Sequence, residues 1–285
     1  MPVLAMTLAY HGGRLAGSQS QSGQRTVQGE VESSLAELFR RPTGLVLAGR
    51  TDRGVHAVGQ VGSCMDHRSD LAVEVITGAV NARLADDIVV VATERRSEGF
   101  HARFDARWRE YRYAVLVGPP NPMLRDRVWS RVERLDVARM AEGARLMIGE
   151  HDFAAMAGGG RGVPWSRHPI GDRGTTRNML RCDCQALQPT RGGSRGALLV
   201  IRAVADGFLP HMVRNIVGAL VEVGRGRRDA SWIAELLGSK DRRGGPMTAP
   251  AHGLTFWGVG YGGDEPDDRG WRDGWEDSAG VLGAC

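Results

Sequence analysis

The order of strand-like and helix-like segments is the feature that most constrains the fold of this chain. Alternating apolar residues predict strands in the first half at residues 3–10, 45–48, 88–92 and 109–117. Helical spacing predicts one helix behind Thr26, which is a suitable cap, and a second over residues 70–84. These segments do not follow the regular strand–helix repeat of a parallel sheet, so the pattern predicts an α+β fold.

The second half of the chain also mixes predicted helices and strands. It predicts helices and strands at residues 136–148, 179–187, 197–205, 210–223, 231–237 and 255–261. A chain of 285 residues can form two modest cores. We therefore expect an N-terminal subdomain over residues 1–107, a C-terminal subdomain over residues 108–263 and a tail over residues 264–285. The tail is rich in Gly and Asp, which predicts disorder.

The charge of the chain is unevenly distributed. The tail from residue 264 carries seven acidic and two basic side chains, so the total of +4 leaves +9 on residues 1–263. Of the 37 basic residues only Lys240 is a lysine. A GC-rich genome explains most of this preference for arginine, but not the net excess. Guanidinium groups bind phosphate through paired hydrogen bonds, so the excess predicts a polyanionic partner.

Several classes of protein are not supported by the sequence. The chain has no apolar run of about 18 residues, and its start lacks the order of charges and small residues of a signal peptide, so we expect a cytoplasmic protein. Four scattered cysteines do not form a disulfide framework. Cys182 and Cys184 lie two residues apart on a predicted strand, without the second pair that a zinc site requires. We predict no metal.

Residues 47–61, "LAGRTDRGVHAVGQV", form a polar turn between two strand-like stretches. Gly49 and Gly54 can adopt the positive φ angles that a sharp loop requires. Asp52 projects between Arg50 and Arg53, which favour its ionised form, as a nucleophile or an ion stabiliser requires. Considered alone, an Asp before Arg-Gly is more often a turn residue with a surface ion pair.

Family resemblance supports the chemical interpretation. "GRTDRGVHAVGQV" resembles the catalytic segment of the TruA family of tRNA pseudouridine synthases, in which the Asp is catalytic. Four further segments resemble family motifs in the same order: "FHARFDARWREYRY", "GEHDFAAM", which is read as a helix end, "FLPHMVRNIVGALVEVGRG" and "TAPAHGL". The resemblance covers the chain from about residue 3 to residue 261.

The resemblance implies roles for five residues. Asp52 is the catalytic residue, acting either by attack on the base or by assisting its departure from C1′. Tyr111 stacks on the target base, and Arg214 pairs with the catalytic Asp and holds the flipped nucleotide. Arg50 contacts the RNA, and Leu254 lines the base pocket. For Tyr111 alone, an aromatic residue on a half-buried strand is the simpler interpretation, and for Arg214 it is an arginine whose stem covers an apolar helix face.

The resemblance also implies the fold, the reaction and the partner. It predicts two similar halves with mainly antiparallel mixed sheets, joined around a basic active-site cleft. It predicts isomerisation of uridine to pseudouridine at positions 38 to 40 in the anticodon arm of tRNA, without a cofactor. It further predicts a homodimer that binds one tRNA across both subunits.

One segment departs from the family pattern. Relatives typically read Y-D-G-x-x-F-x-G-W-Q where this chain has "YHGGRLAGSQ", so His11 replaces an acid and Ser18 replaces a tryptophan. This change favours one alternative, an RNA-binding protein without turnover. A second alternative, a carboxylate-dependent hydrolase, requires another catalytic acid. Asp152 is the available candidate, and a helix cap is its simpler interpretation.

Overall fold

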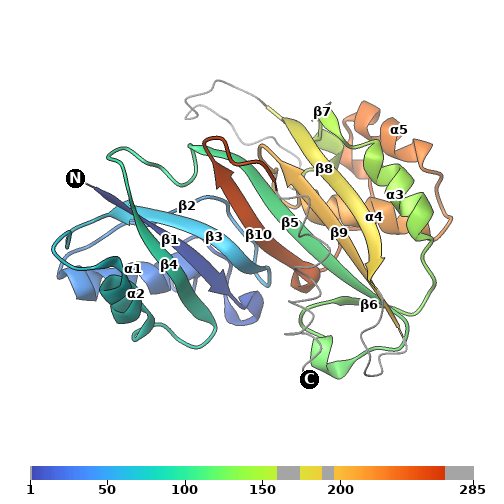
Figure 1. Ribbon diagram of the computed structural model, residues 1–285. Helices are drawn as coiled ribbons and strands as arrows, with labels where there is room; N and C mark the ends of the chain where they lie inside the picture. Colours follow the sequence, from blue (N-terminus) through green and yellow to red (C-terminus); the bar gives the residue numbers. More distant parts are fainter. Residues whose placement is uncertain (1, 159–173, 188–195, 267–285) are drawn as a thin grey trace. The chain divides into compact units, whose positions relative to one another are not determined.

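The computed structural model describes residues 2–158, 174–187 and 196–266, which form two compact units (Figure 1). Unit 1 comprises the described residues of Met1–Arg109 together with Thr255–Asp264. Unit 2 comprises those of Glu110–Leu254 and of Glu265–Cys285. Each unit combines a sheet with α-helices, so the chain has an α+β fold as the sequence predicts. The expected acidic tail lies outside the described residues beyond Pro266.

The sheet of unit 1 is mainly antiparallel. Its strands are β1 (Val3–Tyr10), β2 (Val46–Leu47), β3 (His56–Met65), β4 (Ile88–Arg96) and β10 (Leu254–Tyr261). Strand β1 pairs with β3 on one side and with β4 on the other, and β2 also pairs with β3. Strand β10 joins β3 in parallel, with Phe256 opposite Ala57. This pairing places residues 255–261 in unit 1, whereas the sequence-based division assigned them to the second subdomain.

Helices α1 (Val27–Phe39) and α2 (Val73–Asn81) belong to unit 1. Thr26 caps α1, because its side chain accepts a hydrogen bond from Gly29 N. The two helices are joined by the Ser34 hydroxyl, which donates to Val80 O at 3.1 Å. Helix α2 is shorter than predicted: residues 82–84 form tighter turns, in which Arg83 N donates to Val80 O, and residues 70–72 precede the helix.

The sheet of unit 2 contains β5 (Ala106–Val117), β6 (Trp129–Arg131), β7 (Gly149–Asp152), β8 (Thr176–Leu187) and β9 (Ala197–Ala205). Strands β7, β8 and β9 are antiparallel neighbours, and β6 pairs with β5 in parallel. The apolar periodicity of the sequence does not predict β6 and β7. The segment "GEHDFAAM", read as a helix end, instead forms β7 and a short 3₁₀ helix over Ala154–Met156.

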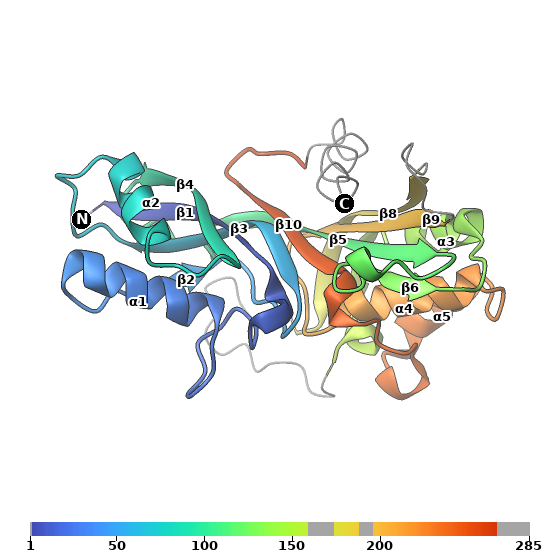
Figure 2. The same ribbon diagram turned by 90° about the horizontal axis from the view of Figure 1, so that it is seen from below.

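Helices α3 (Val137–Arg145), α4 (Met212–Gly224) and α5 (Ser231–Ser239) belong to unit 2. Helices α4 and α5 lie along one face of its sheet (Figure 2). Nearly every apolar side chain of α4 is buried. A Cβ atom at Gly143 of α3 would lie 3.3 Å from Leu220 of α4 and 3.4 Å from Ile233 of α5. The three helices therefore pack closely, and α4 lies within the core of this unit.

Within the described part of the chain, no helix has the length and the apolar character that crossing a bilayer requires.

Candidate functional site

Asp52 lies in a loop of unit 1 between the end of β2 and the start of β3. Its side chain is half-buried, whereas Arg50 and Arg53 are exposed. Val55 N donates to Asp52 O at 3.1 Å and closes the turn. Gly54 has a φ of 83°, the left-handed conformation that its position in the turn requires. The predicted catalytic carboxylate is therefore presented from a tight turn.

Buried polar side chains hold the backbone next to Asp52. Thr51 N donates to Ser18 Oγ at 2.8 Å, and Ser18 N donates to Thr51 O at 3.0 Å. The hydroxyl groups of Tyr10 and Thr51 are 2.9 Å apart. Burial raises the pKa of Tyr10 to about 12, so this phenol stays protonated above pH 10, where an exposed tyrosine ionises. Thr51 is thus held through its backbone and through its side chain.

The start of the loop is held by Gln60. Its side-chain amide donates to Gly49 O at 2.8 Å and accepts from Gly49 N at 3.3 Å. Gly54 has the positive φ expected from the sequence, but Gly49 does not. A Cβ atom at position 49 would lie 2.8 Å from the ring of Phe256, so this glycine is required by close packing against β10.

Arg109 supports the strand that leads into the loop. Its Nε and Nη2 atoms each lie 3.2 Å from Ala48 O, and its Nη1 donates to Ala106 O at 3.0 Å. It also donates to Arg103 O. Partial burial and the neighbouring Arg50 lower the pKa of Arg103. The guanidinium groups of Arg50 and Arg103 are therefore within electrostatic range of each other. Together they give the edge of the Asp52 loop the positive charge that binding of a phosphate group requires.

The segment that departs from the family pattern packs directly on this loop. Gly12 N donates to His56 Nδ1 at 3.2 Å, and the rings of His11 and His56 are 4.5 Å apart. A Cβ atom on Gly12 would overlap Val55 O. His11 and Ser18, the two departures noted in the sequence, are therefore both in contact with the loop that carries Asp52 or with its immediate continuation.

Arg214 lies in the first turn of α4 in unit 2. Its Nε donates to Ala249 O at 2.7 Å, and Ala249 N donates to Arg214 O at 3.1 Å. The next residue, Asn215, is fully buried and donates to Met156 O at 2.6 Å. Its Oδ1 accepts from Thr248 Oγ1 at 2.6 Å and from Arg242 at 3.1 Å. The segment around Ala249 is thereby fixed against the start of α4.

Tyr111 and Leu254 also lie in unit 2. Tyr111 is 7% exposed, and its ring meets Phe208 edge to face with centroids 5.0 Å apart. Leu254 is the first residue of β10, and the boundary between the units falls directly after it. It is buried and directly follows the short 3₁₀ helix over Ala251–Gly253. Tyr113 OH donates to Pro250 O at 2.8 Å, which fixes this segment. The structure thus places Asp52 and Arg50 in unit 1, and the other three predicted site residues in unit 2.

Asp152, the alternative catalytic acid, is bonded to neighbouring residues of unit 2. Its carboxylate accepts from Ala154 N at 3.0 Å and from the Thr175 hydroxyl at 2.5 Å, and it lies 3.3 Å from Lys240 Nζ. Burial opposes ionisation, but the bond from Thr175 and the other two contacts lower the pKa of Asp152 overall. A carboxylate that is held ionised by its structural partners is poorly suited to act as a general acid.

Cys182 and Cys184 are buried on β8. Burial raises the pKa of Cys184 to about 12, and it raises that of Cys182 as well, so both thiols stay protonated. Among the residues that the structure describes, no cluster of three His, Cys, Asp or Glu side chains could hold a metal ion.

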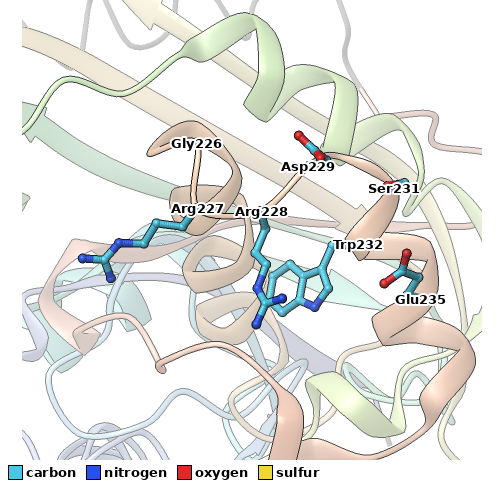
Figure 3. Close-up of a pocket in the computed structure, with 7 residues that line it drawn as sticks. All are labelled: Gly226, Arg227, Arg228, Asp229, Ser231, Trp232 and Glu235. Atoms are coloured by element: carbon cyan, nitrogen blue, oxygen red, sulfur yellow. The ribbon is translucent and has the colours of Figure 1, made fainter.

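A shallow cavity of about 250 Å³ lies beyond the C-terminal end of α4 (Figure 3). Its lining consists of Gly226, Arg227, Arg228, Asp229, Ser231, Trp232 and Glu235. The guanidinium of Arg228 lies 5.2 Å from the ring centroid of Trp232. Arg214 lies in the first turn of α4, and the cavity begins after its last turn. A helix rises about 1.5 Å per residue, so most of the length of α4 separates the two. The cavity is therefore not part of the predicted site.

Comparison with known proteins identifies the family. The tRNA pseudouridine synthase A of Chloroflexus aurantiacus is 41% identical over 267 residues, which cover 92% of this chain and 89% of that protein. The chain belongs to the tRNA pseudouridine synthase family. The synthases of Solidesulfovibrio magneticus and Geobacillus kaustophilus are 42% and 40% identical, and the alignments cover 92% and 89% of this chain and 92% of each relative.

The family model described as tRNA pseudouridine synthase matches residues 144–262. This range contains the "MVRN" and "TAPAHGL" segments, whereas the alignments with whole relatives also cover most of unit 1. The resemblance predicted from the motifs is confirmed. The sequence did not indicate how three side chains hold the site: Ser18, Gln60 and Asn215. Gln60 and Asn215 stand within segments that resemble family motifs, and Ser18 is evident in the sequence only as a departure from the family pattern.

Proposed function

We propose that this chain isomerises uridine to pseudouridine at positions 38 to 40 in the anticodon arm of tRNA. The observation that carries the proposal is the 41% identity over 92% of the chain with a protein named tRNA pseudouridine synthase A. In this reaction the N1–C1′ bond breaks, a C5–C1′ bond forms, C5 loses a proton and N1 gains one. The atoms balance within the nucleotide, so the reaction consumes no group donor or redox partner.

In our proposal Asp52 performs the covalent chemistry, by attack on the base or by stabilising C1′ as the base departs. Its half-buried position on a loop held by Ser18 and Gln60 supports this role, because a catalytic carboxylate must be oriented before the substrate binds. The neighbouring exposed Arg50 provides positive charge for the RNA backbone.

The residues of unit 2 bind the flipped nucleotide in this proposal. C1′ and C5 cannot be reached by a side chain inside a stacked helix, so the base must leave the stack. Tyr111 stacks on the base, Leu254 lines its pocket, and Arg214 holds the nucleotide and pairs with Asp52. The fixed position of Arg214 on Ala249 O supports a binding role, because a guanidinium oriented in advance loses less entropy when it binds.

We further propose that the two α+β units are the two halves of a basic cleft, and that the protein acts in the cytoplasm as a homodimer on one tRNA. The charge of +9 on residues 1–263 supports binding to the phosphate groups of the RNA, which does not depend on the RNA sequence. Recognition of the folded RNA by its shape then selects the substrate.

The test is to map pseudouridine in tRNA from cells with and without the gene. We expect the modification at positions 38 to 40 to disappear without the gene and to return with a plasmid copy. Unchanged pseudouridine at these positions in the deletion strain would contradict the proposal. Binding of tRNA by the purified protein without formation of pseudouridine would instead favour an RNA-binding protein that has lost turnover.

A further inference from the structure

Ser18 lies where this chain departs from the family pattern, and it is a fully buried polar neighbour of the Asp52 loop. Its relative exposure is 0%. No role for this residue follows from the motifs, because the pattern has a tryptophan at this position. Its contacts are with the loop that carries the proposed catalytic residue, so they indicate what the serine does.

The hydrogen bonds of Ser18 connect a helix to the loop. Both backbone polar groups of Thr51, the residue before Asp52, bond to Ser18: Thr51 N donates to its Oγ at 2.8 Å, and Thr51 O accepts from its N–H at 3.0 Å. Ser18 O in turn accepts from Gln28 N in the first turn of α1 at 3.0 Å. The position of Thr51 is therefore fixed relative to α1 through a single residue.

The hydroxyl group is the chemical requirement at this position. An indole carries one N–H donor and no acceptor, so a tryptophan at position 18 could not accept the hydrogen bond from Thr51 N. The approach is also close, since a Cβ atom on the adjacent Gly17 would lie 2.8 Å from Thr51 O. Gly17 has a φ of 103°, which brings the short serine side chain to the loop.

We propose that Ser18 is a positioning residue that sets the orientation of Asp52 for the isomerisation. The inference rests on the proposed function. Removal of the hydroxyl leaves Thr51 N–H buried without its acceptor, so the backbone must move to find another partner. A shift of that kind displaces the carboxylate from the reacting atoms and slows the chemical step, while the surface that binds RNA is unchanged. The turnover number kcat should fall and the KM for tRNA should not change.

The test compares two buried serines of unit 1. Ser34 is 3% exposed, and its hydroxyl donates to Val80 O at 3.1 Å, away from the Asp52 loop. Ser18→Ala and Ser34→Ala each remove one buried hydroxyl, so we expect similar decreases in Tm. Only Ser18→Ala should lower kcat, by about tenfold, when tritium release from C5-labelled uridine in tRNA is followed. The KM should stay within about twofold of wild type for both variants.

Ser18→Cys is the second variant, because a thiol has nearly the same shape but is a weak acceptor. It should reproduce the loss of kcat with a smaller change in packing. All rates are measured at a temperature at which circular dichroism shows that each variant is folded. If Ser18→Ala and Ser18→Cys both retain the kcat of Ser34→Ala, the positioning role is wrong. A wild-type protein that forms no pseudouridine would instead contradict the proposed function itself.

Discussion

The Asp52 loop in unit 1 and the Arg214 segment in unit 2 hold their polar residues by different means. The backbone of the loop depends on side chains from elsewhere in unit 1, with Ser18 bonded to Thr51 and Gln60 bonded to Gly49. Arg214 instead lies in a helix, and its side chain is directed by the bond to Ala249 O. A loop without ladder hydrogen bonds needs buried partners for its backbone, whereas a helix largely supplies its own.

Because the loop and the helix are held differently, substitutions in the two regions should have different effects. Changes in the partners of the loop should alter the geometry of Asp52, and therefore turnover or the stability of unit 1. Changes at the start of α4 should alter nucleotide binding when they remove Arg214, and stability when they remove its buried neighbours.

The largest effect outside Asp52 itself is expected for Arg214→Ala. The loss of a fixed guanidinium that binds the nucleotide should reduce kcat/KM by about 100-fold, or roughly 3 kcal/mol. The matched control is Arg225→Ala at the other end of α4, where the side chain pairs with Glu222 at 3.2 Å. Kinetics of tritium release should show that the control stays near wild type. An Arg214→Ala enzyme with wild-type kcat/KM would remove Arg214 from the site.

The next effect concerns the pH dependence of unit 1. Burial raises the pKa of Tyr10 from 10.0 to about 12, so the folded protein keeps a proton that the unfolded chain loses above pH 10. The stability from this group is complete below pH 10 and is lost as the pH rises to 12, by up to about 3 kcal/mol. Tyr10→Phe should remove this part of the loss. The free energy of unfolding is measured in urea at several pH values from 9 to 12. If it falls equally with pH for the wild type and for Tyr10→Phe, the prediction is wrong.

A smaller effect is expected for Asn215→Ala. The variant removes the partner of Met156 O, Thr248 and Arg242 at a fully buried position, which should reduce the free energy of unfolding by roughly 2 kcal/mol. Asn121→Ala, which removes only a cap bond to Met123 N, should cost less than about 1 kcal/mol. Denaturant unfolding measures both. If the two variants lose equal stability, the buried network does not fix the start of α4.

Periodicity identified the long elements of both units. The strand Val3–Tyr10 and the helix behind Thr26 are confirmed, because each is long enough for its apolar residues to show a period. The short strands β6 and β7 have too few residues to show a period. The pairing of β10 with β3 joins residues about 200 positions apart, which no local pattern reveals.

The sequence predicted those site residues that stand in segments resembling family motifs. Asp52 and Arg214 were selected because each stands in a recognisable segment. Ser18 and Asn215 are polar residues whose importance depends on burial and on partners distant in the chain, and a single sequence shows neither. For Gly49 the sequence indicated the correct residue for the wrong reason, since close packing by Phe256 requires it.

The catalytic role of Asp52 is tested most directly by Asp52→Asn, which keeps the size of the side chain and removes its charge and nucleophilicity. The control is Asp70→Asn, an exposed acid of unit 1 that pairs with Arg68 at 2.9 Å. Tritium release from C5-labelled uridine in tRNA and gel-shift binding of the same RNA are measured for both variants. We predict that Asp52→Asn binds tRNA at least as tightly as wild type and releases no detectable tritium, while Asp70→Asn behaves as wild type. Release by Asp52→Asn at a rate near wild type would show that Asp52 is only the turn residue of its loop.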